Sequence, residues 1–203
     1  FRVPSGVPVL FQALDDKGRA VQTMRSLTYV QAGQTLSCIG CHEHRDLAPP
    51  LGRVPRAMTR EPSRLALDPP GSWPLDYREL VQPVLEEHCV SCHRPDGKDA
   101  KAAKFDLTAA KSYQSLISYA GGDVEKLAKE RDRSVPGECV AANCKLMALL
   151  TEDGGHEGAK LDADAQYRLA TWLDTYAHRQ GYFSPEQAEQ LRAFREELAG
   201  MLA

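Results

Sequence analysis

The sequence predicts a mainly α-helical fold that begins with a β-hairpin and contains long loops. Three observations point to this class. Two strand-like segments separated by a turn sequence occur before residue 30. Apolar residues at helical spacing dominate after residue 75. The chain also holds 13 prolines and 15 glycines, which is enough for long loops but too few for a disordered chain.

Length and charge narrow the possible functions. The 203 residues make one domain of ordinary size or two small ones. A formal net charge of −3 excludes nucleic-acid binding that is driven by overall basicity. The sequence has no run of about 18 apolar residues, the length that a membrane-spanning helix needs.

The first predicted module, residues 1–70, starts with the hairpin. Residues 7–14 form an apolar run that predicts a strand, residues 15–18 have the composition of a turn, and residues 20–29 form the expected return strand. Seven prolines fall within residues 45–75, which are therefore predicted to form a loop at the module boundary.

The second predicted module, residues 71–203, is helical. Asp76 and Glu79 resemble a capping box at the start of a helix that leads into Cys89. Pro83 argues against one continuous helix, but it fits the first turn of a shorter one. Further helices are predicted over residues 108–119, 139–150 and 162–176, and after Ser184, where proline follows a capping residue.

Two copies of the pattern Cys-x-x-Cys-His occupy residues 38–42 and 89–93. In this pattern each thiol can add to one vinyl group of a porphyrin, and the histidine binds the iron. We therefore expect two covalently bound haem c groups. Their attachment residues would be Cys38, Cys41, Cys89 and Cys92, with His42 and His93 as the proximal iron ligands.

A structural zinc site or a disulfide pair is the alternative interpretation of each motif. Zinc would need two more ligands at short spacing from each motif. The helix that precedes Cys89 and the turn at residues 94–97 are typical of small cytochromes c. The full fold prediction is thus a cytochrome c-like dihaem domain, mainly α, with an N-terminal β-hairpin.

The third cysteine pair, Cys139 and Cys144, has a four-residue spacer and is followed by Lys145. Covalent haem attachment takes place outside the cytoplasm, where disulfides persist, so a disulfide is predicted here. Two free buried thiols or a third haem with a lysine ligand are the alternatives. The same reasoning predicts a periplasmic or extracellular protein. Either its leader has been removed or the chain is a piece of a larger exported protein.

A sixth ligand at each iron separates an electron carrier from a catalyst. His156 follows two glycines in a loop between predicted helices and is the expected distal ligand of the second haem, a solvated loop histidine being the alternative. Met24 is the candidate for the first haem, a core methionine being the alternative. Four further side chains are less well placed: Met58, His44, His88 and His178.

Three blocks of sequence resemble the haem-bearing region of hydrazine synthase alpha subunit-related proteins. They are residues 11–26 with 38–43, residues 81–93, and residues 145–182, and the resemblance covers most of residues 7–182. It implies a two-haem module of a larger secreted protein, with a six-coordinate second haem that transfers electrons and His156 at a shared Gly-His position. Hydrazine synthase has a tyrosine ligand just beyond its first motif. Residues 43–47 contain no tyrosine, which argues against hydrazine chemistry.

The expected function is electron transfer between a donor and an attached or docked redox partner, with no catalytic residue assigned. The four propionates of two haems would move the formal charge from −3 to about −7, which favours a partner with a basic docking face. The alternative is a haem enzyme that binds peroxide or a small nitrogen compound at the first haem. Glu43, His44, Arg45 and Asp46 would then be available for proton transfer. A sensor is a third class, for which the sequence offers no direct support.

Overall fold

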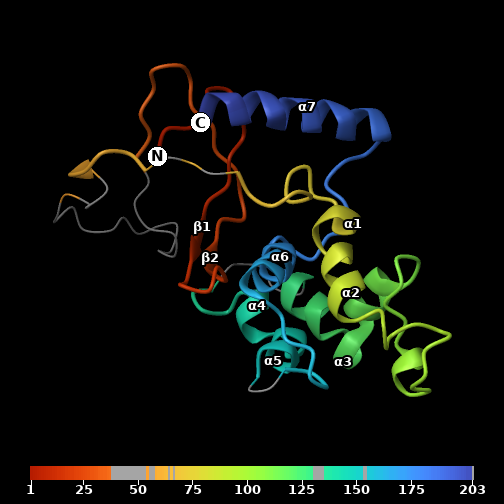
Figure 1. The fold of residues 1–203 in the computed structure, drawn as a ribbon. Helices are drawn as coiled ribbons and strands as arrows, with labels where there is room; N and C mark the ends of the chain where they lie inside the picture. The colour runs from red at the N-terminus through yellow and green to blue at the C-terminus, as the bar shows by residue number, and fades with distance from the viewer. Residues whose placement is uncertain are drawn as a thin grey trace.

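The computed structural model describes residues 1–37, 54, 58–63, 65, 67–129, 135–152 and 155–202. A short hairpin lies beside a group of helices, and the last helix crosses the other end of the molecule (Figure 1). The predicted mainly helical class with an N-terminal hairpin is confirmed. The elements in chain order are β1 (Gln12–Leu14), β2 (Ala20–Thr23), α1 (Tyr77–Leu80), α2 (Gln82–His88), the 3-10 helix η2 (Ala102–Lys104), α3 (Ser112–Lys129), α4 (Val140–Asn143), α5 (Lys145–Thr151), α6 (Ala163–Asp174) and α7 (Pro185–Leu202).

The hairpin pairs β1 with β2 in antiparallel order, Gln12 facing Thr23, with an irregularity near Leu14. Its turn is held by Asp15, whose Oδ1 accepts hydrogen bonds from two backbone N–H groups at 2.9 Å. Both strands are shorter than predicted. Beyond them Val9 and Thr28 form only an isolated bridge, because the register of Gln12 opposite Thr23 would instead place Val9 opposite Ser26.

The predicted helix starts are confirmed where a local cap signal marks them. The Asp76 carboxylate accepts a hydrogen bond from the Arg78 N–H at 2.9 Å and caps α1. Pro83 lies in the first turn of α2, where its missing N–H leaves no bond unmade. Asp162 caps α6 through the Ala165 N–H, and Ser184 precedes Pro185 at the start of α7.

Two predicted helices differ from the structure. The helix expected over residues 108–119 is α3, which runs to Lys129 with a non-helical break from Tyr119 to Gly122. The helix expected over residues 139–150 is divided into α4 and α5 at Cys144, whose backbone is extended (φ −78°, ψ 145°). The positive φ angles of Gly121 and Gly122 explain the first difference, because glycine adopts this conformation without steric cost.

The core lies between the helices α1 to α6. Trp172 of α6 is fully buried and donates a hydrogen bond from Nε1 to the His178 carbonyl at 3.0 Å. Its ring and that of Tyr113 both meet Tyr77 edge to face, each with centroids 5.2 Å from it. Edge-to-face contacts stabilise the core beyond the burial of apolar surface, and they favour one relative orientation of the helices that carry the rings.

The last helix, α7, contacts α1 and the segment before it through side chains. The Arg192 guanidinium lies 2.7 Å from the Glu79 carboxylate, and the Phe194 ring packs edge-on against Trp73 at 5.6 Å. Among the residues that the structure describes, no helix has the length and apolar character that a membrane span requires.

Asp174 connects the hairpin to the helices. Its carboxylate is 5% exposed and accepts hydrogen bonds from the N–H groups of Ala20 in β2, at 2.7 Å, and Ala141 in α4, at 2.9 Å. Burial raises the pKa of Asp174, and the two N–H groups oppose this effect. Residues from both predicted modules therefore meet at one buried carboxylate.

Replacing Asp174 by asparagine should lower the free energy of unfolding by about 1–3 kcal/mol. The asparagine NH₂ cannot accept a hydrogen bond, so one of the N–H groups of Ala20 and Ala141 loses its partner. Urea unfolding measures the change. Asp164→Asn is the control, because that carboxylate is 69% exposed, and its effect should stay within about 0.5 kcal/mol. Equal losses in the two variants would contradict the assignment.

Candidate haem-binding site

The second Cys-x-x-Cys-His motif forms a turn directly after α2. The N–H groups of Cys92 and His93 both donate to the Cys89 carbonyl, at 3.1 and 3.0 Å. Cys89 is half-buried against the core, whereas Cys92 is exposed. Burial raises the pKa of the Cys89 thiol to about 11, with a smaller contribution from Cys92. The turn thus brings the three motif residues together at the end of a helix that is anchored in the core.

The His93 imidazole is oriented by backbone carbonyls. Its Nδ1 lies 3.1 Å from the Ala102 oxygen and 3.2 Å from the Phe105 oxygen. Carbonyl oxygens only accept hydrogen bonds, so these contacts select the tautomer with a proton on Nδ1. The other nitrogen, Nε2, then keeps a lone pair for a metal, the arrangement that second-shell partners give to ligating histidines.

His156 lies opposite His93. The two ring centroids are 5.9 Å apart and the ring planes differ by 29°. Two imidazoles that bind one metal ion from opposite sides have centroids about 6 Å apart, because each metal–nitrogen bond is about 2 Å long. The centroid spacing is therefore the one that an iron between two imidazoles requires, and it brings together the two histidines that the sequence predicted as ligands of the second haem.

A tight turn holds His156. The backbones of His156 and Ala159 form an isolated bridge, and the intervening Glu157 and Gly158 have φ angles of 50° and 82°. Gly155 also has a positive φ, and a Cβ atom there would overlap the Ala159 carbonyl. Glycine at this position therefore permits a close approach between two backbone segments, which sets the position of the His156 backbone.

Two aromatic residues, Phe105 and Tyr119, lie next to one another beside His93. The sequence did not indicate either of them. The Phe105 ring meets the imidazole edge-on, with centroids 5.8 Å apart, and Tyr119 meets Phe105 at the same centroid distance. Neither residue falls in a motif, and they come from different segments of the chain. No spacing rule could have connected them with residue 93.

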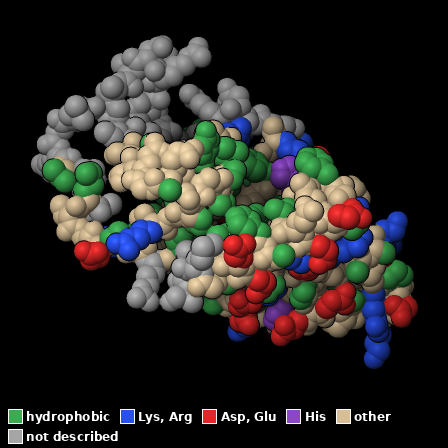
Figure 2. All heavy atoms as spheres, turned by 90° about the horizontal axis from the view of Figure 1, so that it is seen from above, with side chains coloured by type: hydrophobic (Ala, Val, Ile, Leu, Met, Phe, Trp, Pro, Cys, Tyr) green, Lys and Arg blue, Asp and Glu red, His purple; other side chains and the backbone are tan. Residues whose placement is uncertain are grey.

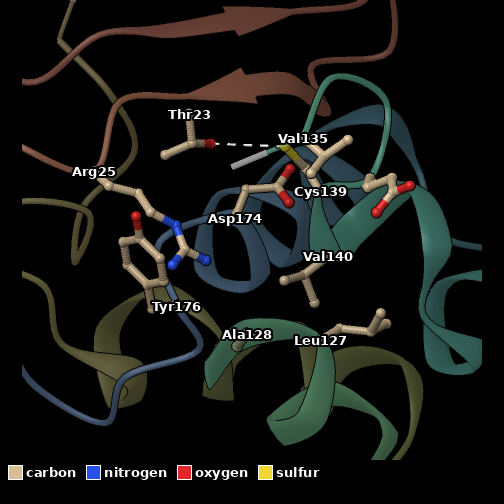
Figure 3. Close-up of a pocket in the computed structure, with 10 residues that line it drawn as sticks. Thr23, Arg25, Leu127, Ala128, Val135, Cys139, Val140, Asp174 and Tyr176 are labelled. Carbon is tan, nitrogen blue, oxygen red and sulfur yellow. Dashed lines mark hydrogen bonds between the residues drawn. The ribbon is translucent and has the colours of Figure 1, made fainter. Parts of the chain in front are cut away.

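A second group of polar side chains lies, among apolar ones, around a small hollow of about 30 Å³ between the hairpin and the helices (Figure 3). The Arg25 guanidinium lies over the Tyr176 ring at 5.8 Å, and the Thr23 hydroxyl is 3.8 Å from the Cys139 sulfur. The Asp174 oxygens that face this region accept backbone N–H groups. These contacts join the hairpin to α4 and α6.

The structure does not form the predicted disulfide between Cys139 and Cys144, and this expectation is corrected. Cys139 precedes α4 and faces the hollow, whereas Cys144 follows α4 and is 1% exposed in the core. The Cys144 sulfur accepts a hydrogen bond from the Met147 N–H at 3.5 Å, and burial raises the pKa of its thiol to about 11. One turn of helix thus sends the two side chains into different surroundings.

The first motif lies outside the described residues. Cys38, Cys41, His42 and His44 all belong to it or follow it closely, so their predicted roles stay predictions. Met24 is half-buried just after β2, and its role as a haem ligand also stays a prediction. The less favoured candidates have other contacts than the His93–His156 pair. Met58 is 68% exposed, the His88 imidazole lies 4.0 Å from the Glu87 carboxylate, and His178 is exposed beside the Tyr176 ring.

Comparison with known proteins gives one partial similarity. A family model described as the hydrazine synthase alpha subunit middle domain matches residues 1–43 of the 203. The match spans the hairpin and ends just after the first Cys-x-x-Cys-His motif. No curated protein and no solved structure matches the chain significantly. The resemblance is thus supported for its first block, and for residues 81–93 and 145–182 it stays a prediction.

Alkylation under denaturing, non-reducing conditions should add one alkyl group to each of Cys139 and Cys144. In the folded protein Cys144 should resist the reagent, because its thiol is buried and its pKa is about 11. Mass spectrometry of the peptide that carries both cysteines measures the result. A peptide that takes up no alkyl group and is lighter by two hydrogens would instead show that the two cysteines form a disulfide.

Proposed function

We propose that this chain is an exported electron-transfer module that carries two covalently bound haem c groups. The His93–His156 pair is the observation that carries the proposal, with its centroid spacing of 5.9 Å. An iron held by two imidazoles has no open position for a substrate, which favours a carrier over a catalyst at this site. The exposed Cys92 agrees with a site whose attachment edge lies near the surface, where a redox partner can approach.

Each residue of the second site has a separate task. Cys89 and Cys92 would attach the porphyrin, while His93 and His156 would bind the iron from opposite sides. The carbonyls of Ala102 and Phe105 keep the proton of His93 on Nδ1. When bound, haem supplies a one-electron ferric–ferrous couple. By analogy, Cys38, Cys41 and His42 would hold the first haem, with Met24 as its proposed distal ligand.

The proposed location and partner follow from the same chemistry. Attachment of haem to Cys-x-x-Cys-His takes place outside the cytoplasm, so the module would work in the periplasm or outside the cell. Figure 2 shows acidic side chains gathered over part of one face of the molecule. Haem propionates would add to this negative charge, which favours a redox partner or attached domain with a basic docking face. The similarity of residues 1–43 to a hydrazine synthase domain also supports a place within a redox protein.

The chain matured in a periplasm should contain two haems, which a pyridine haemochrome assay counts per polypeptide. Replacing both Cys89 and Cys92 by serine should leave one haem, because the second motif then has no thiol for attachment. The matched control replaces Cys139 and Cys144 by serine and should keep two. Two haems in the Cys89→Ser/Cys92→Ser variant, or fewer than two in the unsubstituted chain, would contradict the proposal.

Replacing His156 by alanine should convert one of the haems from low spin to high spin in the ferric EPR spectrum and let it bind carbon monoxide when reduced. The reason is that the iron opposite His93 loses its second imidazole. His178→Ala is the control, since His178 is an exposed histidine outside the pair. An unchanged spectrum in His156→Ala would contradict the assignment of His156 as an iron ligand. Carbon monoxide binding by the unsubstituted protein would favour the haem-enzyme alternative at the first haem.

A further inference from the structure

Helix α3 contains a break whose geometry is costly. Tyr119 leaves the helical region (ψ 141°), and the next three residues, Ala120, Gly121 and Gly122, have φ angles of 52°, 75° and 78°. A left-handed conformation is strained for alanine and persists only where the surroundings impose it. Here Leu116 before the break and Val124 after it are both buried, so each half of α3 is fixed in the core.

The break places Tyr119 at the end of a chain of ring contacts that leads to His93. Tyr119 meets Phe105 at 5.8 Å with an interplanar angle of 68°, and Phe105 meets His93 at 5.8 Å with an angle of 81°. Both contacts are edge to face, an arrangement that resists rotation of either ring. Phe105 therefore touches His93 twice, through its ring and through the carbonyl that faces Nδ1.

The carbonyl contacts of His93 do not fix its plane by themselves. Nδ1 carries one hydrogen and faces two acceptors at almost equal distances, 3.1 Å to Ala102 and 3.2 Å to Phe105. The imidazole can pivot between these two oxygens with little change in hydrogen bonding. The edge of the Phe105 ring limits this pivot, and the Phe105 ring is itself held by Tyr119.

We propose that Tyr119 is a positioning residue of the second haem site, which fixes the Phe105 ring and through it the plane of the His93 imidazole. The inference rests on the proposed function, because it gives His93 the role of an iron ligand. The orientation and hydrogen bonding of an axial histidine tune the iron that it binds. The break in α3 is then the backbone distortion that delivers the Tyr119 ring to Phe105.

The test compares Tyr119→Leu with Tyr119→Phe in the full haem-loaded chain. Leucine removes the ring that meets Phe105, whereas phenylalanine keeps it. Tyr113→Leu is the matched control: Tyr113 lies on the same helix and is half-buried, but its ring contacts Tyr77 and Trp172. The readouts are the largest ferric EPR g value and the midpoint potential of the second haem, which is identified as the signal lost in His156→Ala.

Both readouts should shift in Tyr119→Leu and stay at the wild-type values in Tyr119→Phe and Tyr113→Leu. Unchanged values in Tyr119→Leu, or an equal shift in Tyr113→Leu, would overturn the inference. If Tyr119→Leu does not fold, Phe105→Leu must produce the shift instead, and wild-type values there would also overturn it. The haemochrome count separates this failure from that of the proposed function, since an unsubstituted chain without haem refutes the proposed function directly.

Discussion

The arrangement of this molecule depends on one buried carboxylate at the end of α6. Asp174 is almost fully buried, and a charged group in such a place is tolerated only when N–H donors replace its lost water. The donors belong to β2 and α4, so the hairpin, α4 and α6 must meet at this point. Neighbouring bonds reinforce the junction: the Gln12 amide donates to the Asp174 carbonyl at 2.9 Å, and the Gly137 N–H donates to the Val21 carbonyl at 2.7 Å. The hairpin, which lies within the segment similar to a hydrazine synthase domain, is thereby packed against α4 and α6.

The same helix connects this junction to the candidate haem site. The start of α6 is capped by Asp162, and the buried Leu161 precedes the cap, so the loop that carries His156 is held at its far end by the core. On the opposite side, α2 and the following turn hold His93, and the Leu107 N–H donates to the His93 carbonyl at 2.9 Å. The backbones of both histidines are therefore held in place by the core. Preorganisation of this kind suits an electron carrier, because rigid axial ligands reduce the rearrangement that accompanies a change in iron charge.

Local signals predicted the elements that local contacts form. The caps at Asp76, Asp162 and Ser184 each act within four residues of the chain, and Pro83 acts on its own turn, so the corresponding helix starts could be read from short stretches of sequence. The division of 139–150 into two helices and the absence of the Cys139–Cys144 disulfide could not be predicted in this way. They follow from burial of Cys144 in the core and from contacts of Cys139 with the hairpin, which involve residues more than 100 positions away.

The sequence by itself determined the composition of the candidate site: two Cys-x-x-Cys-His motifs, a loop histidine at residue 156, and a hairpin followed by capped helices. These features depend on residue type and on spacing within a few turns of backbone, which a linear pattern records. Only the tertiary structure decided that the His93 and His156 rings lie with centroids 5.9 Å apart, that Phe105 packs against His93 and Tyr119 against Phe105, and that Asp174 joins the hairpin to α4. These arrangements depend on side chains from distant segments that share one interior, and the free energy of burying them together has no signature in any short stretch of the sequence.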